Sequence, residues 1–247
     1  MPLTMWSHRQ MTFAERIHEI YDRNKPKQIH PFIGSSVSTP STGGLRIMVV
    51  GINAYVSTAD EKTSPSWNAE WFRDQTYRYQ RGVWRDVKAL GAALTSPSYR
   101  LGSKTFQGMP SLFVTNAIKV YMPEATGKHA DQLSHDDFMR HLDQWHDELD
   151  AMAEHHVLPH VIAIIGAPFW PFACASFRTG AFTHMRTKTY ESCHGPCLHF
   201  LNKITLDAPG GEHELLLVRL RHPAGRARTG SPKWLLGQAE LTAMAGV

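Results

Sequence analysis

Cysteine is scarce in this chain, with three residues among 247, and the number is odd. So few cysteines exclude a disulfide framework and favour a reducing compartment. The sequence also lacks any apolar run long enough to span a membrane, and no signal-peptide pattern opens it. We therefore expect a cytoplasmic protein without membrane contact, and nothing in the sequence indicates an assembly larger than a monomer.

The net charge is small and positive, +4 with histidine neutral, and the sequence pI is near 9.0. Fifteen histidines add positive charge at lower pH. Basic residues concentrate in residues 219–228, which hold four arginines, and Lys233 follows closely. In many proteins a segment of this kind is an ordinary solvated loop. In others it binds a polyanion such as DNA.

The length suits one domain with a sizeable core, and we expect a single domain over residues 1–247, with 1–11 as a loose terminus. Four short apolar runs rich in β-branched residues have the character of buried strands. They cover about residues 45–50, 111–115, 160–165 and 214–220. Helical patterns alternate with these runs. The expected fold class is therefore α/β, a three-layer α/β/α domain with a central four-stranded parallel sheet.

Pairs of capping residues mark the starts of two predicted helices. Thr12 with Glu15, and Ser134 with Asp137, have capping-box spacing. Each pair precedes an apolar stripe at helical spacing, which predicts helices from Thr12 to about residue 24 and from Ser134 to about residue 155. Further helices are predicted over residues 83–94, from about residue 168 and over 231–244.

Polar side chains follow three of the four predicted strands. Asn53 and Tyr55 come just after the first strand, Asn116 after the second and His222 after the fourth. The carboxyl ends of parallel strands meet at one edge of a sheet, where open α/β folds bind their ligands. Taken singly, each residue has an ordinary explanation as a turn cap, a backbone contact or a packed loop residue. Because they share one position relative to their strands, we expect them to form one site.

Four segments, in this order, resemble the motifs of one known family. They are Gly51-Ile-Asn-Ala-Tyr, Leu112-Phe-Val-Thr-Asn-Ala-Ile, Ile162-Ala-Ile-Ile-Gly-Ala-Pro-Phe-Trp and His222-Pro-Ala-Gly. Together they resemble the uracil-DNA glycosylase superfamily over about residues 45–236. The Gly-Ile-Asn opening is similar to the mismatch-specific thymine/uracil branch, and Tyr55 is similar to the uracil branch, so the chain has mixed features.

The resemblance implies a monofunctional hydrolase of N-glycosyl bonds that removes uracil from DNA and leaves an abasic site, without cofactor or metal. By this resemblance the catalytic residues are His222 and Asn53. His222 donates a hydrogen bond to O2 of the departing uracil anion, as an oxyanion hole does. Asn53 places the attacking water, and since an amide is a weaker base than a carboxylate, we expect a slow hydrolytic step.

The implied base pocket uses other residues of the same motifs, beginning with Gly51 and Ile52. Asn116 offers both a donor and an acceptor, which complement O4 and N3–H of uracil and reject cytosine. Tyr55 stands where the 5-methyl group of thymine would go and excludes it. A flipped-out base also needs an aromatic stacking partner. The candidates for this partner are, in order, Trp67 and Phe72.

The chain departs from the family pattern at Ala54 and at Ala224-Gly225, where the family has proline, serine and proline. The missing serine removes a phosphate contact. Where the family often has an apolar wedge, this chain has Arg226, which either stacks in the duplex or binds phosphate together with Arg228 and Lys233. These departures keep open a second interpretation, a catalytically weak or inactive member that binds uracil-containing or abasic DNA.

Two further alternatives stay open. The first is an unrelated α/β enzyme that acts on a nucleoside or another small molecule, with the basic segment incidental. The second concerns Cys193 and Cys197, which together with His199 have a spacing that can bind zinc. No second cysteine pair completes such a set, so we expect a loop with free thiols and no metal.

Overall fold

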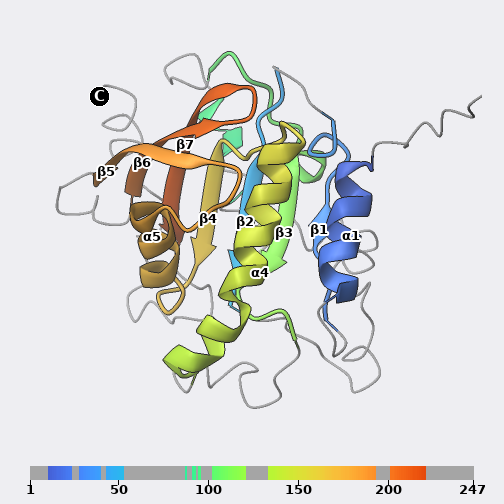
Figure 1. Cartoon of the computed structure of the whole chain (residues 1–247). Coiled ribbons are helices and arrows are strands. Elements are labelled where there is room, and N and C mark those ends of the chain that lie inside the picture. Colours follow the sequence, from blue (N-terminus) through green and yellow to red (C-terminus); the bar gives the residue numbers. More distant parts are fainter. Residues whose placement is uncertain are drawn as a thin grey trace, which may run out of the picture.

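The computed structural model describes residues 11–23, 28–39, 43–52, 87, 91–92, 94–95, 102–120, 133–192 and 201–220. Its helices and strands share one compact arrangement (Figure 1). In chain order they are α1 (Phe13–Arg23), β1 (Phe32–Ile33), β2 (Ile47–Gly51), the 3-10 helix η3 (Met109–Ser111), β3 (Leu112–Asn116), α4 (His135–Glu154), β4 (Val161–Ile165), α5 (Trp170–Thr179), β5 (Arg186–Ser192), β6 (Leu201–Ala208) and β7 (Gly211–Leu220). Residues 1–10 of the predicted loose terminus (1–11) and the helix predicted at 231–244 lie outside the described residues.

One mixed sheet of seven strands organises these residues, in the order β1-β3-β2-β4-β7-β6-β5. The neighbouring strands β3, β2, β4 and β7 run parallel, and they correspond to the four predicted strands. β1, β6 and β5 pair antiparallel with their neighbours. The sheet therefore differs from the four-stranded parallel sheet that we predicted, because antiparallel strands extend it at both edges.

Two of the three unpredicted strands, β1 and β5, carry a weak apolar signal. β1 has two residues, and β5 has no buried residue along its length. Both are edge strands, which need no continuous apolar run. β6 joins β7 through Pro209 and Gly210, and Gly210 has φ +97°. Proline followed by a glycine of positive φ is the pattern of a type II turn.

α1 and α4 begin where their capping pairs predict. At α4, Asp137 N donates to Ser134 Oγ at 3.2 Å, and Ser134 N donates to the Asp137 carboxylate at 2.9 Å. Thr12 and Glu15 make the same reciprocal pair at the start of α1. The predicted stripe of α1 is buried, which confirms this helix: Phe13, Ile17, Ile20 and Tyr21.

The three described helices cover one face of the sheet. Successive strand residues point to opposite faces, so Val50 of β2 joins one core cluster and Val49 joins the other. The first cluster contains residues of α1, α4 and α5, which lie on the same side of the sheet in Figure 1. The second contains Val87 and Leu94, which are helical and buried. The α/β fold class is confirmed, and a complete helical layer on the second face stays a prediction.

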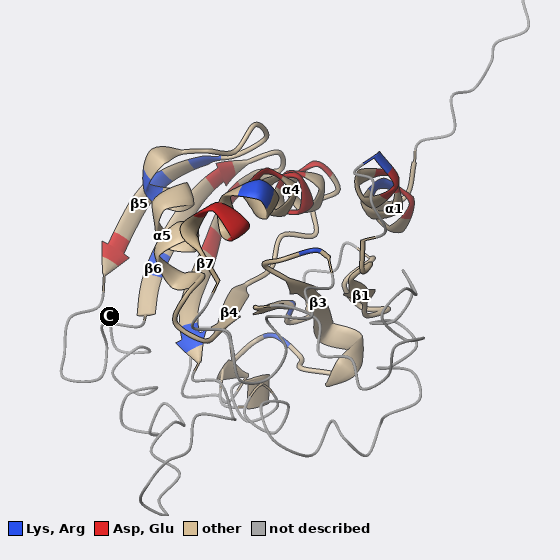
Figure 2. Ribbon diagram, turned by 90° about the horizontal axis from the view of Figure 1, so that it is seen from below, with Lys and Arg blue, Asp and Glu red and all other residues tan. Residues whose placement is uncertain are grey.

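The α4 surface is acidic. The helix holds seven Asp and Glu residues, of which Glu148 and Asp150 are buried, and one arginine, Arg140. Figure 2 shows this as red segments along α4, and others lie on α1. Such a surface repels polyanions. Within the described ranges, no helix has the length and apolar character needed to cross a membrane.

Candidate functional site

The carboxyl ends of the four parallel strands lie along one edge of the sheet, the edge that faces the viewer in Figure 2. Gly51 of β2 is in register with Asn116 of β3, and Ile165 of β4 is in register with Leu220 of β7. The amide of Gly166 donates to the Leu220 carbonyl at 2.8 Å. Each motif singled out in the sequence therefore contains or follows the carboxyl end of a strand on this shared edge.

Asn116 lies against Gly51, with no room for a side chain between them. A Cβ added to Gly51 would lie 2.7 Å from Oδ1 of Asn116. Asn116 is only 9 % exposed. Its side chain points to the same face of the sheet as that of Val114, which belongs to the second core cluster. The backbone at Gly51 does not call for glycine, because its φ is not positive, but a side chain there would displace the Asn116 amide. The structure thus brings two predicted pocket residues together.

The segment after β3 is tied to the end of β2 by backbone hydrogen bonds. Ala117 N donates to Gly51 O at 2.7 Å, and Ile118 N donates to Ile52 O at 2.9 Å. The Ile52 side chain is buried in the first core cluster. It also approaches Gly166, where an added Cβ would lie 3.0 Å from its Cδ1 atom. These contacts fix the positions of the carboxyl ends of β2, β3 and β4 relative to one another.

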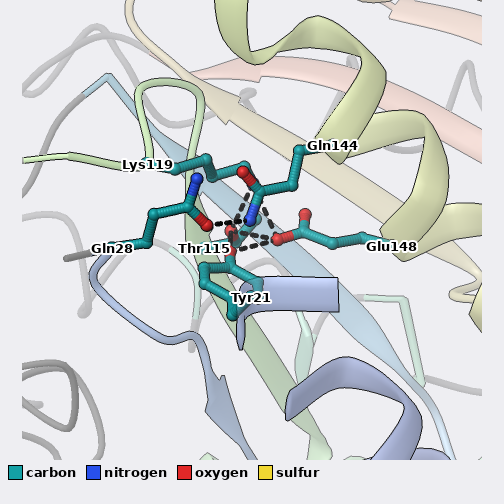
Figure 3. Close-up of polar contacts among 6 residues, drawn as sticks. All are labelled: Tyr21, Gln28, Thr115, Lys119, Gln144 and Glu148. Atoms are coloured by element: carbon teal, nitrogen blue, oxygen red, sulfur yellow. Dashed lines mark hydrogen bonds and ion pairs between the residues drawn. The ribbon is translucent and has the colours of Figure 1, made fainter. Parts of the chain in front are cut away.

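A buried ionic cluster that no motif predicted lies on the other face of the same strand end (Figure 3). Lys119 Nζ donates to Glu148 Oε1 at 2.7 Å and to Thr115 Oγ1 at 2.8 Å. The Thr115 hydroxyl donates to the same carboxylate oxygen at 2.8 Å, and the Tyr21 hydroxyl also donates to it. The side chains of Lys119 and Glu148 are 0 % exposed. This cluster connects α1, α4 and the end of β3.

The burial of the cluster shifts the pKa values of its members. Burial lowers the pKa of Lys119, and the charge of Glu148 beside it partly offsets this shift. Burial also raises the pKa of Tyr21 well above its ordinary value, and the Glu148 carboxylate raises it further. Tyr21 is therefore a neutral donor at neutral pH. Oε2 of Glu148 is buried and has no hydrogen-bond partner in the part of the chain that the structure describes.

A second buried contact borders this cluster (Figure 3). Gln144, one turn before Glu148 on α4, donates through Nε2 to Gln28 Oε1 at 2.6 Å. Ile29 N donates to the carbonyl of Lys119 at 2.8 Å. A sequence signal for this arrangement existed, because Glu148 lies three residues after Trp145 and so falls within the apolar stripe of α4.

Most predicted site residues lie outside the described residues. They are Asn53, Tyr55, Trp67, Phe72, His222, Arg226, Arg228 and Lys233. Cys193, Cys197 and His199 lie outside as well. Among the residues that are described, no group of three His, Cys, Asp or Glu side chains is arranged to hold a metal ion. Cys174 is a buried free thiol, and burial raises its pKa.

A cleft of about 660 Å³ lies between α4 and α5. Its walls are mainly apolar and include Phe138, Met139 and Phe172. No predicted site residue lines it. We therefore treat it as separate from the edge that carries Asn116.

Comparison of the sequence with models of known protein families gives no match, and comparison with curated proteins gives none either. The resemblance to the uracil-DNA glycosylase superfamily thus rests on the four sequence motifs alone. A function has to be inferred from the chemistry of this edge.

Proposed function

We propose that this chain is a DNA repair glycosylase that hydrolyses the N-glycosidic bond of deoxyuridine in DNA, releasing uracil and leaving an abasic site. The observation that carries the proposal is the contact of Asn116 with Gly51 at the edge where the parallel strands end. An amide held at such an edge suits the recognition of a flipped-out base, because it presents a donor and an acceptor side by side.

In the proposed reaction, water adds to C1′ of the sugar while the bond from C1′ to N1 breaks, and uracil leaves as an anion. The proton that the water loses passes through solvent to this anion, so the products are neutral uracil and an abasic sugar. His222 donates a hydrogen bond to O2 of this anion, a contact worth ~3 kcal/mol of barrier. Asn53 orients the water through its side-chain oxygen. Asn116 pairs with O4 and N3–H, and Tyr55 excludes the 5-methyl group of thymine. The reaction needs no cofactor.

The distribution of charge supports DNA binding at the carboxyl edge. The acidic surface of α4 disfavours an approach of phosphates from that side (Figure 2). The basic residues Arg226, Arg228 and Lys233 follow β7, whose carboxyl end belongs to the edge. We infer that these side chains contact the DNA backbone and that the protein acts as a cytoplasmic monomer.

A base-release assay tests the proposal. Oligonucleotides with one uracil, single-stranded or paired with guanine or adenine, are incubated with the protein and then cleaved with alkali. We expect cleavage at uracil, and a loss of about a hundredfold or more in His222→Ala, the typical effect of removing one such donor. Asn53→Ala and Asn116→Ala should also slow release. Asn202→Ala is the matched control, because Asn202 is a buried amide on β6 that contacts Cys174.

The same assay separates the alternatives when DNA binding is measured beside it. Salt-sensitive binding of uracil-containing DNA without base release would favour the non-catalytic binder that Ala54 and Ala224-Gly225 suggest. An absence of DNA binding at low salt would contradict both interpretations. It would favour an enzyme that acts on a small molecule.

A further inference from the structure

The buried cluster of Tyr21, Thr115, Lys119 and Glu148 holds the chain on both sides of Asn116. Thr115 directly precedes Asn116, and Lys119 follows it by three residues. Both side chains are bonded to the same oxygen of Glu148 (Figure 3). We propose that this cluster is a positioning device for Asn116 and that it determines how strictly the site selects its base. The second half of this statement rests on the proposed function.

The cluster acts on Asn116 from the opposite face of the strand. Thr115 points toward α1 and α4, where it meets Tyr21 and Glu148. The next residue, Asn116, points to the other face and lies over Gly51. The cluster therefore does not touch a base bound at Asn116. Its four members are positioning residues, which act through the backbone between residues 115 and 119.

That backbone is held at several points. Ala117 and Ile118 donate to the carbonyls of Gly51 and Ile52. The carbonyl of Lys119 accepts from Ile29, and its ammonium group is bonded to Glu148. If the ammonium were not held, the turn would keep its backbone bonds to β2 but would lose its attachment to α4. We infer that this attachment fixes the distance between the Asn116 amide and Gly51.

Stability alone does not account for a fully buried ion pair. Removing two charges from water is costly, and apolar side chains of similar volume often replace such pairs without loss of stability. A buried polar contact is better suited to select one arrangement among several. Here three donors converge on Oε1 of Glu148 from α1, β3 and the turn that follows β3. A shift of any one of these elements away from the others would break its hydrogen bond to Oε1.

The decisive experiment replaces the pair by apolar residues. The double variant Lys119→Met/Glu148→Leu removes both charges and leaves the Tyr21 and Thr115 hydroxyls, 3.1 Å apart, to bond each other. We expect it to fold, with native circular dichroism. Hydrogen exchange at the Ala117 and Ile118 amides should become faster by about tenfold or more as the turn loosens. The preference for uracil over cytosine should fall by about ten- to a hundredfold, the usual effect of a small misplacement.

Glu148→Gln is the milder second variant. It keeps an acceptor for Tyr21, Thr115 and Lys119 but removes the charge, and we expect smaller changes in the same direction. Asp150→Asn is the matched control: this buried carboxylate on the same helix accepts from the amides of Thr183 and His184 instead. It should lower stability without changing exchange at Ala117 or base preference.

The two readouts separate the two proposals. Unchanged exchange and unchanged base preference in folded double or Glu148→Gln variants would overturn the positioning role. If the unmodified protein releases no base, the proposed function fails. In that case hydrogen exchange alone still decides whether the cluster holds the turn. Faster exchange at Ala117 in Asp150→Asn as well would also count against a specific role, because it would show that any loss of stability loosens the turn.

Discussion

Oδ1 of Asn116 lies 2.7 Å from the position that a Cβ on Gly51 would occupy. The two residues are register partners on neighbouring parallel strands, β3 and β2. A glycine in a buried strand is usually unfavourable, since it leaves no side chain to pack. At this position the absence of a side chain leaves the space that the amide of Asn116 occupies.

Gly51→Ala should therefore displace Asn116. We expect the rate of uracil release to fall by about ten- to a hundredfold, because an ångström of misplacement is enough for such a loss. Strain at the strand end should lower the free energy of unfolding by about 1–3 kcal/mol. Single-turnover rates and urea unfolding measure the two effects. Gly43→Ala is the control, since its Cβ would meet nothing within 4 Å, and equal release rates in the two variants would contradict the prediction.

Arg226 and Arg228 should contribute to DNA affinity without contributing to base choice. Replacing either residue by alanine should reduce the slope of the logarithm of the binding constant against the logarithm of salt concentration by about one. The preference for uracil over cytosine should stay the same. Fluorescence anisotropy at several salt concentrations measures the slope. An unchanged slope in both variants would show that these arginines do not contact phosphate.

His160 should make the fold sensitive to acid. Its Nδ1 accepts a hydrogen bond from Arg46 N at 3.0 Å. Burial, followed by the positive charges of Arg46, Lys104 and His213, lowers the pKa of His160 to about 2. In the unfolded chain this histidine has a pKa near 6.5, so below that pH it binds a proton that it does not bind in the folded chain. This contribution to stability is complete above about pH 6.5 and decreases as the pH falls below it.

His160→Gln tests this dependence. Between about pH 4 and 6, the slope of the unfolding free energy against pH should fall by about one proton, or ~1.4 kcal/mol per pH unit. Burial also lowers the pKa of His213, which stays in the variant and keeps part of the slope. Urea titrations at a series of pH values give the comparison. Identical slopes for the two proteins would mean that His160 titrates normally in the fold.

Ser134 should stabilise α4 through its cap. Ser134→Ala removes the acceptor for Asp137 N and should lower the free energy of unfolding by about 1 kcal/mol. Ser134→Asn keeps an acceptor at the same position and should be close to neutral. Thermal unfolding of the three proteins distinguishes the cap from other effects of this site. The prediction is wrong if Ser134→Asn loses as much stability as Ser134→Ala.

The sequence predicted the parts of the fold that follow a local rule. Capping pairs located the starts of α1 and α4, and apolar runs located β2, β3, β4 and β7. Strand β6 escaped prediction although Leu201, Ile204 and Leu206 are buried and Pro209-Gly210 marks its turn. β5 gave no such signal, because an edge strand is stabilised by pairing with its neighbour more than by its own apolar residues.

The buried pair of Lys119 and Glu148 could not be predicted from the sequence. Lys119 follows a strand and Glu148 lies in an acidic helix, and both residue types are almost always solvated. Only the position of Glu148 beside Trp145 pointed inward. Their pairing depends on how α4 crosses the end of β3, which no local pattern encodes. The site residues after β2 and β7, Asn53 and His222 among them, remain predictions from their motifs.

The antiparallel part of the sheet has a consequence for the order in which the molecule assembles. β5, β6 and β7 follow one another in the chain and pair in that order, whereas β2 must find β4 far along the sequence. Short loops close faster than long ones, so the β6–β7 hairpin should form first. β4 can then pair with β7, which is already part of the hairpin. During refolding, the amides of β6 and β7 should become protected from hydrogen exchange before those of β2. Pulse-labelled hydrogen exchange measures when each strand gains its protection.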